Sequence, residues 1–337
     1  MAATACIPRA TRSTTRLGRV DGELQIGNNA RIDAADGKRV VVSQGARFQG
    51  SAEVNCDFEC EALEVGHRGL QPVRINGNLI VHRKLEISET VEVSGAITAG
   101  EIIATGKLKA QSIRCGALST PGNARISGSL VCDAVEIGKT TEVKGDLRAG
   151  TLDVIGELLL WGTLEVSDSM VVYGSADISK TVRSESLKIG GQFRAARAEV
   201  VDEVDLAGEA WTAQGLTANT VVIATGSRCL GPIVANRVEI GSSGGVLADW
   251  KKTWAGQSLK VRAIWKGTRV EDIYAKHVHL GASSQSGRVF AETIQFERGA
   301  VADEIQYTGD LQGPTHTGHF RHIPRRVTKL PTNPRGS

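Results

Sequence analysis

The stretch TTEVKGDLRAGTLDV, residues 140–154, decides the fold because the chain repeats its pattern many times. Its aliphatic positions are Val143, Leu147, Leu152 and Val154. Close copies are TVEVSGAITAGEIIA at 90–104, SGSLVCDAVEIG at 127–138, LGPIVANRVEIG at 230–241 and SGRVFAETIQFERG at 286–299. The residues between the aliphatic positions are glycine, alanine and charged side chains, so the pattern has to be explained by packing before any residue is assigned chemistry.

The repeated unit reads Φ-x-small-x-x-Φ-x-Φ, where Φ is an aliphatic or aromatic residue. Its third Φ recurs at positions 135, 152, 170, 187, 204, 221 and 238, a spacing of 17 with a single 18. Alternation with period two indicates strands, and the x-x step resets the phase, which indicates a bend. Short strands separated by bends at a fixed period predict an all-β fold, a single-stranded parallel β-helix (β-solenoid) of about 17 residues per coil.

In such a solenoid like residues stack into inward ladders. The third Φ positions predict one buried ladder, through Val135, Leu152, Met170, Leu187, Val204, Val221 and Val238. The small position beside the bend leaves no room for a large inward side chain. Cys60 and Cys132 occupy it, with Cys115 in a neighbouring inward column, so we interpret these cysteines as small buried hydrophobic residues.

The segments VKGDLRAGTLDVIG (143–156) and VSGAITAGEIIATG (93–106) resemble the core repeats of the bactofilins, a family of polymer-forming cytoskeletal proteins. The resemblance covers about residues 22–311. It implies a right-handed, triangular β-helix that polymerises end to end without nucleotide and is flanked by disordered tails. The chain departs from the family in its length and in insertions that break the repeat, which suggests a tandem arrangement of two continuous solenoid segments, 22–155 and 156–311.

The charge distribution predicts basic tails. Of the 40 Lys and Arg residues, nine lie in segments 1–19 and 311–337, which contain no acid, so the segment between them carries 31 basic against 37 acidic residues. We expect disordered basic tails at 1–21 and 312–337, and we expect them either to be simply solvated or to dock on an anionic membrane surface, with nucleic acid not excluded by the charges. The contacts would be Arg9, Arg12, Arg16, Arg19, Arg321, Arg325, Arg326 and Lys329.

Two further surfaces are expected to bind proteins. The first and last coils of a solenoid expose unpaired strand edges, and end-to-end stacking would cover them. The predicted polymer-end contacts are Leu24, Ile26, Ile305 and Tyr307. An insertion at 241–265 breaks the repeat and gathers aromatic residues that form either a partner patch or a cover for the flank: Trp250, Trp254 and Trp265.

The sequence thus predicts a non-enzymatic, self-assembling scaffold that organises client proteins or shapes the cell, with no catalytic residues, cofactor or metal. The N-terminal segment, residues 1–19, lacks the apolar stretch of a secretory signal. We therefore expect a cytoplasmic protein, with the inner membrane face as a second location. One alternative is a hexapeptide-type β-helix acyltransferase, which needs a histidine base between coils; His277 and His279 are expected to point outward, and His67 and His82 lack a nearby Asp or Ser in the sequence. The other alternative is a monomeric solenoid adaptor or adhesin.

Overall fold

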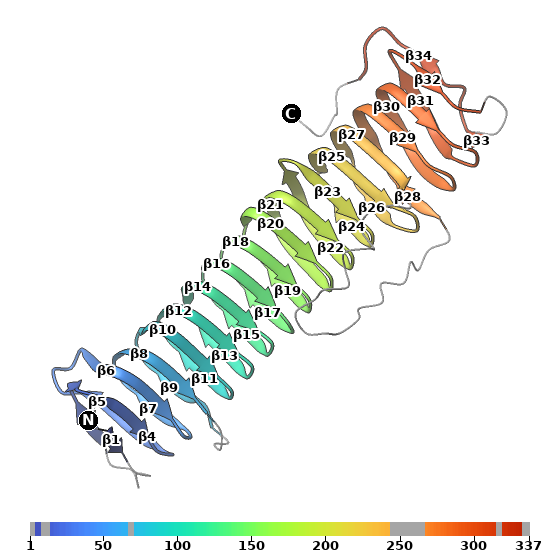
Figure 1. Cartoon of the computed structure of the whole chain (residues 1–337). Coiled ribbons are helices and arrows are strands. Elements are labelled where there is room, and N and C mark those ends of the chain that lie inside the picture. The colour runs from blue at the N-terminus through green and yellow to red at the C-terminus, as the bar shows by residue number, and fades with distance from the viewer. Residues whose placement is uncertain (1–3, 8–13, 67–70, 243–266, 315–318, 332–337) are drawn as a thin grey trace. The chain divides into compact units, whose positions relative to one another are not determined.

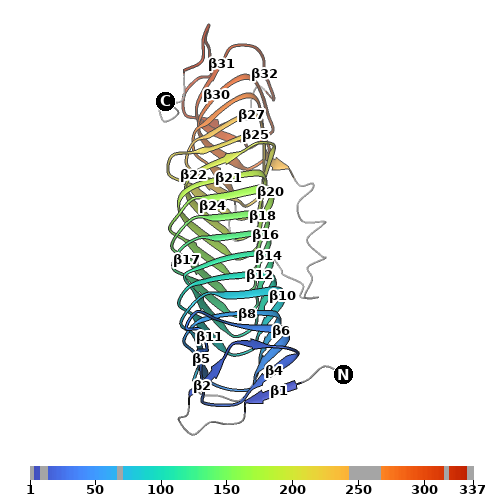
Figure 2. The same cartoon turned by 90° about the vertical axis from the view of Figure 1, so that its left-hand side faces the viewer.

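Parallel β-strands make up all the regular structure of the described residues. The computed structural model describes residues 4–7, 14–66, 71–242, 267–314 and 319–331. Contacts divide the chain into unit 1, Met1–Gly162, and unit 2, Thr163–Ser337. Each unit is a β-solenoid in which strands about 17 residues apart lie side by side in register (Figures 1 and 2). The predicted all-β parallel solenoid is therefore confirmed.

Each turn of unit 1 carries strands on three faces. Face A consists of short strands, and face B and face C are the first and second halves of long strands that bend in the middle. The strands of face A are β2 (Thr14–Leu17), β5 (Ala30–Ala34), β7 (Ala52–Val54), β9 (Val73–Ile75), β11 (Thr90–Val93), β13 (Lys107–Ala110), β15 (Asn123–Ile126), β17 (Thr140–Val143) and β19 (Glu157–Leu160). The long strands are β6 (Arg39–Phe48), β8 (Asp57–Val65), β10 (Leu79–Ile87), β12 (Ala96–Ala104), β14 (Ser112–Thr120), β16 (Leu130–Ile137) and β18 (Leu147–Val154). Face B begins with β3 (Arg19–Val20), and face C begins with β1 (Thr4–Ile7) and β4 (Glu23–Ile26).

Unit 2 repeats this plan with less uniform strand lengths. Its longest strand, β21, contributes to all three faces of its turn. The strands are β20 (Leu164–Val172), β21 (Ser175–Ile189), β22 (Gln192–Val200), β23 (Glu203–Leu206), β24 (Glu209–Thr212), β25 (Leu216–Ala224), β26 (Arg228–Leu230), β27 (Ile233–Ser242), β28 (Thr268–Val270), β29 (Ile273–Leu280), β30 (Ser284–Phe296), β31 (Val301–Tyr307), β32 (Leu311–Gln312), β33 (His319–Phe320) and β34 (Arg325–Arg326).

The repeat pattern forms these strands because alternate side chains enter the core of each turn. The seven residues of the predicted ladder are all buried, and the register pairs Val135 with Leu152 in unit 1 and runs from Met170 to Val238 in unit 2. Each such residue removes its apolar surface from water, which stabilises the fold by about 1.5–3 kcal/mol per large side chain. The predicted ladder is thus confirmed within each unit.

The bend between faces B and C tolerates an extra residue. At Val81 and at Val166 the register shifts where the sequence carries one residue more than the unit requires. The pairing resumes in phase at Lys84 and at Ser169, because an extra residue accommodated as a bulge leaves the flanking alternation intact.

Glycines stack where one turn passes close to the previous one. A Cβ atom built on Gly145 would lie 2.7 Å from the carbonyl oxygen of Gly128, and one on Gly95 would lie 2.7 Å from that of Gly77. A Cβ on Gly122 would collide even more closely with the backbone oxygen of Gly106. These glycines therefore serve close backbone approach.

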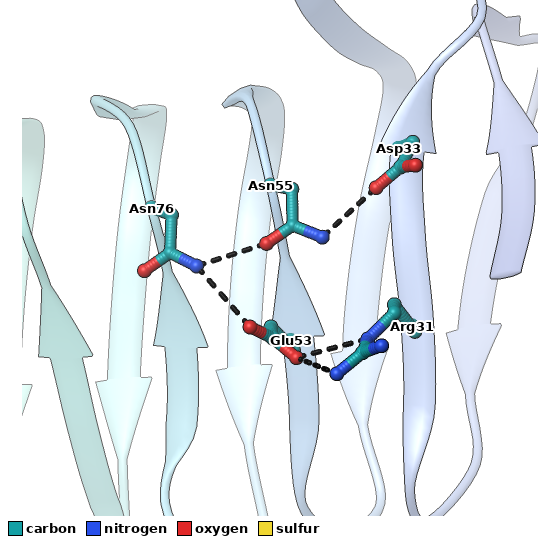
Figure 3. A network of polar contacts seen from close by, with 5 residues as sticks. All are labelled: Arg31, Asp33, Glu53, Asn55 and Asn76. Carbon is teal, nitrogen blue, oxygen red and sulfur yellow. Dashed lines mark hydrogen bonds and ion pairs between the residues drawn. The ribbon is translucent and has the colours of Figure 1, made fainter. Parts of the chain in front are cut away.

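The outward side of face A in unit 1 carries an in-register ladder of charges. Its members, in the order of pairing, are Arg31, Glu53, Arg74, Glu92, Lys109, Arg125 and Glu142. Ion pairs join Arg31 to Glu53 at 2.8 Å and Arg125 to Glu142 at 2.7 Å. Beside it, the amide of Asn55 donates to Asp33 at 2.9 Å and that of Asn76 donates to Asn55 at 2.9 Å (Figure 3). Polar ladders of this kind hold neighbouring turns in register.

Candidate functional site

The first turn of unit 1 is the best candidate for an assembly surface. We call β1, β2 and β3 together the N-terminal coil. Each of these strands pairs on one side, with β4, β5 and β6 respectively, and has no second partner among the described residues. The backbone N–H and C=O groups on the other side form an open parallel edge, which is the kind of edge to which another chain can add a strand.

For residues 4–7, 14–17 and 19–20, the described strand residues of the segment 1–21, the N-terminal coil corrects the expectation of a disordered arm. Thr4–Ile7 pairs residue by residue with Glu23–Ile26, and Thr14–Leu17 pairs with Arg31–Ala34. Its strands are only two to four residues long, so they are too short to show an alternation that a sequence pattern would reveal. Tertiary pairing with the next turn, rather than local propensity, forms these strands.

The predicted polymer-end residues of the N-terminal side lie inside the solenoid. Leu24 is 1% exposed and Ile26 is 0% exposed, and β4 is covered by β1 on one side and by β6 on the other. Leu24 and Ile26 are therefore core residues of the second turn, and the prediction that they form an end contact is wrong in position by one turn.

The side chains at the open end are small and partly apolar. Ala5 is exposed, Leu17 and Val20 are half-buried, and only Ile7 is buried, at 8% exposure. Cys6 is exposed and free. The end surface thus offers an apolar cross-section beside the open strand edges, which would lose water on contact with a second surface.

The last turn of unit 2 is built differently. We call β32, β33 and β34 the C-terminal coil; β33 and β34 both pair with β31, and β32 pairs with β30. Ile305 is completely buried in β31, and Tyr307 is half-buried. Tyr307 follows Ala275 and Ala291 in one column, and Arg326 follows Tyr307, so large side chains replace the small residue at the bend.

The edge of the C-terminal coil is poorly suited to strand addition. Its three strands have two residues each, and Pro314 and Pro324 flank two of them. Very short strands, prolines and charged residues are the features by which proteins protect sheet edges. Ile305 and Tyr307 therefore do not form the exposed end; Ile305 is covered within the solenoid.

The basic residues proposed for an anionic surface are exposed wherever the structure describes them. Arg9 and Arg12 lie outside the described residues, as do the three tryptophans of the insertion, Trp250, Trp254 and Trp265. Arg16 and Arg19 are exposed on the N-terminal coil, and Arg19 forms an ion pair with Asp21 at 3.0 Å. The remaining four are exposed on or after the C-terminal coil: Arg321, Arg325, Arg326 and Lys329.

Two exposed tryptophans were not singled out from the sequence. Trp161 is 47% exposed and Trp211 is 44% exposed, and the guanidinium of Arg194 lies 5.0 Å from the Trp211 ring centroid. Trp211 occupies an outward position of β24, and Trp161 directly follows β19, where it continues the outward positions of the alternation. That alternation was the signal that could have identified them.

Three histidines, His82, His277 and His279, lie on outward strand faces, where each has a partner from a neighbouring turn. His82 lies 3.0 Å from Glu59, and His277 Nδ1 lies 2.7 Å from the Thr293 hydroxyl. His279 lies 3.4 Å from Glu297. The sequence expectation that His82 lacks a partner considered chain neighbours only, and Glu59 is 23 residues away along the chain. His67 lies outside the described residues.

The surface around His277 and His279 is a shallow hollow that is open to solvent. The hollow has a volume of about 500 Å³, lies over β27, β29 and β30 and includes Arg237, His277 and Asp310 in its lining. Within the described part of the chain, no group of three or more His, Cys, Asp or Glu residues is placed to hold a metal ion.

No helix among the described residues has the length and apolar character needed to cross a membrane.

Three of the buried cysteines, Cys60, Cys115 and Cys132, lie in one inward ladder of face B in unit 1, and buried Cys229 lies on β26 of unit 2. Cys115 pairs in register with Cys132, so the two share one column, which corrects the prediction that Cys115 lies in a neighbouring one. Burial raises the pKa of Cys60 and of Cys229 to about 12, and a hydrogen bond with Cys132, together with burial, raises the pKa of Cys115. These thiols are held in the neutral form, which is a poor nucleophile.

Comparison with known proteins adds no name to this geometry. The chain matches no model of a protein family, no curated protein and no solved structure.

Proposed function

We propose that this chain is a non-enzymatic, bactofilin-like scaffold that associates with further copies of itself through its terminal coils, without nucleotide, and that organises client proteins or shapes the cell. The observation that carries the proposal is the open edge of the N-terminal coil. The repeat VKGDLRAGTLDVIG (143–156), which resembles bactofilin core repeats, is the reason for naming the bactofilins as the type of scaffold.

Association would give the backbone groups of the open edge hydrogen-bond partners, in the same way that each turn of the solenoid supplies partners to the next. Inside unit 1, β4 has partners on both sides, whereas β1 has one among the residues that the structure describes. A second copy placed against β1 and β2 would supply hydrogen-bond partners to their free backbone groups and would cover Ala5, Leu17 and Val20. Both effects favour the associated state.

The two ends are expected to contribute unequally. The N-terminal coil has two strands of four residues, whereas the C-terminal coil has only strands of two residues with prolines between them. The N-terminal contact should therefore be the stronger of the two, and longer polymers should require higher protein concentration than the first association step.

The test is to place charges on the open end without disturbing the core. In the variant Ala5→Lys with Leu17→Glu, both changed side chains remain in contact with water in the single chain because these positions are exposed or half-buried. We expect the unchanged protein to form larger species in analytical ultracentrifugation and in negative-stain electron micrographs without ATP or GTP. The variant should sediment as a single chain.

The matched control is the double variant Ser127→Lys with Ser94→Glu. It carries the same two charges, but on the outer surface of interior turns. Ser127 is exposed, and both residues follow face A strands whose edges are already paired. The control should assemble like the unchanged protein. The proposal fails when the unchanged protein stays a single chain at high concentration, or when the charged N-terminal coil assembles as well as the control.

A further inference from the structure

A basic corner at the C-terminal end of unit 2 has the composition of a lipid-binding surface. We define the basic corner as residues 321–329, which run from β33 to the turn after β34. Its backbone is fixed on the solenoid: Arg321 N–H donates to the Ala302 carbonyl at 3.2 Å, and Val327 N–H donates to the Tyr307 carbonyl at 2.8 Å. The corner is thus presented by a folded turn and not by a free tail.

Ile323 is the most exposed large hydrophobic residue of the described chain, at 86%. Its apolar neighbours in the sequence, Phe320 and Val327, are less exposed than Ile323, because both are half-buried. Single exposed hydrophobic residues are common on proteins, so exposure alone carries no argument. Here Ile323 lies between β33 and β34, directly before Pro324, which limits the conformations available to the backbone.

Four exposed cations lie within six residues of Ile323 in the sequence: Arg321, Arg325, Arg326 and Lys329. Residues 311–337 contain no acid. Arg321 lies 3.5 Å from Asp303, and Arg326 donates to the Thr308 carbonyl at 3.3 Å. Among the described residues, none of Arg325, Arg326 and Lys329 forms an ion pair, so their charge remains available to an external anion.

We propose that the basic corner docks on an anionic lipid bilayer, with Ile323 entering the headgroup region and the cations contacting lipid phosphates. The combination selects lipid over nucleic acid. A nucleic-acid backbone would attract the cations, but it gives an isoleucine side chain no apolar surroundings. A bilayer supplies both, and stable attachment to membranes generally requires two such signals together.

The test uses the full chain and sedimentation with vesicles of phosphatidylcholine, with and without phosphatidylglycerol. We expect binding to the anionic vesicles only. Each cation near an anionic surface contributes roughly a fivefold gain in binding, so Arg325→Gln with Arg326→Gln should weaken it roughly 25-fold. Ile323→Ser should weaken it about tenfold, since partial burial of the side chain is lost, whereas Ile323→Leu should bind like the unchanged protein.

The matched control for the apolar contribution is Val201→Ser, which removes another highly exposed aliphatic side chain, at 74% exposure, and should leave binding unchanged. Absence of binding to anionic vesicles overturns the proposal. So does equal binding of Ile323→Ser and the unchanged protein, which would show contact through charge alone. Binding to a double-stranded DNA fragment that survives Ile323→Ser and exceeds vesicle binding would assign the corner to nucleic acid instead. Self-association is measured without lipid, so the two proposals fail separately.

Discussion

Leu152 shows at the scale of one residue how strictly the interior is defined. It is fully buried in β18 and pairs with Val135. Leu152→Asp would place a charge in an apolar column without a partner, and we expect it to lower the free energy of unfolding by about 3 kcal/mol or more. The measurement is urea denaturation followed by circular dichroism. Arg148→Asp, on the exposed side of the same strand, is the control and should cost far less; equal effects would mean that the register of the ladder is wrong.

Gly122 tests close approach between turns. A Cβ atom there would collide with the backbone oxygen of Gly106, and backbone atoms have little freedom to move away. Gly122→Ala should therefore lower the free energy of unfolding by about 1–3 kcal/mol. Gly45, also in unit 1, is the control because a Cβ atom there would lie at an ordinary 3.8 Å from the nearest atom, the Ala62 oxygen. Gly45→Ala should be neutral or slightly stabilising, and a melting temperature for Gly122→Ala equal to that of the control would contradict the packing argument.

Individual inward residues were well predicted from the sequence, and the errors have one cause. Alternation with period two identifies which side chains enter the core, so the ladder from Met170 to Val238 was placed correctly. It does not say which positions of successive turns share a column. Leu108 and Ala110 lie on β13, whereas Cys115 lies on β14 beside Cys132, although the same motif spans both strands.

At the scale of the strand, Glu92 joins two turns of face A. It accepts from Lys109 at 2.6 Å and from Arg74 at 3.1 Å, and its hydrogen bond with Lys109 is the main cause of its lowered pKa. A lowered carboxyl pKa contributes stability above the unfolded-state value of about 4.3, and this contribution is lost as the pH falls through the folded-state value. Because the cations are half-exposed, the contribution should stay below about 1 kcal/mol.

The prediction concerns Glu92→Gln. This variant should melt below the unchanged protein at pH 7, and the difference should close as the pH is lowered past about 4. Thermal unfolding by circular dichroism at several pH values measures it. Glu292→Gln, at an exposed position of β30, is the control and should show no such convergence. A Glu92→Gln difference that persists unchanged in strong acid would show that the ion pairs are not its origin.

Short strands were the elements that the sequence could not reveal. β1, β2 and β3 contain ten residues in total, in strands of two to four residues, and they exist because β4, β5 and β6 offer an edge. Contacts between turns were hidden for a similar reason. His82 and Glu59 are neighbours only once the coil length is known, so the candidate end surface and the polar pairs had to come from the structure.

For the whole molecule, strands are the only regular elements expected in solution. A far-ultraviolet circular dichroism spectrum should show a β-type minimum without helical bands, because the described residues contain no helix. Substitutions at Leu24 and Ile26, which the sequence predicted as polymer-end contacts, are now expected to affect stability. Leu24→Lys with Ile26→Glu should now unfold or loosen unit 1, because both residues are buried, whereas Ala5→Lys with Leu17→Glu should keep the spectrum and melting temperature unchanged. Equal melting of the two double variants would contradict the placement of β1 over β4.

The in-register stacking of turns bears on how chains of this kind change during evolution. Leu130 and Leu147 occupy the same position of successive turns, so removing residues 130–146 would join Ser129 to Leu147 and bring each face of the shortened unit back into phase. Each turn contacts only its neighbours, and the loss of one creates no new kind of contact. Tandem duplication or deletion of whole turns is therefore a neutral route to different lengths, whereas an insertion longer than the single-residue bulges at the bend has to leave the solenoid as a loop.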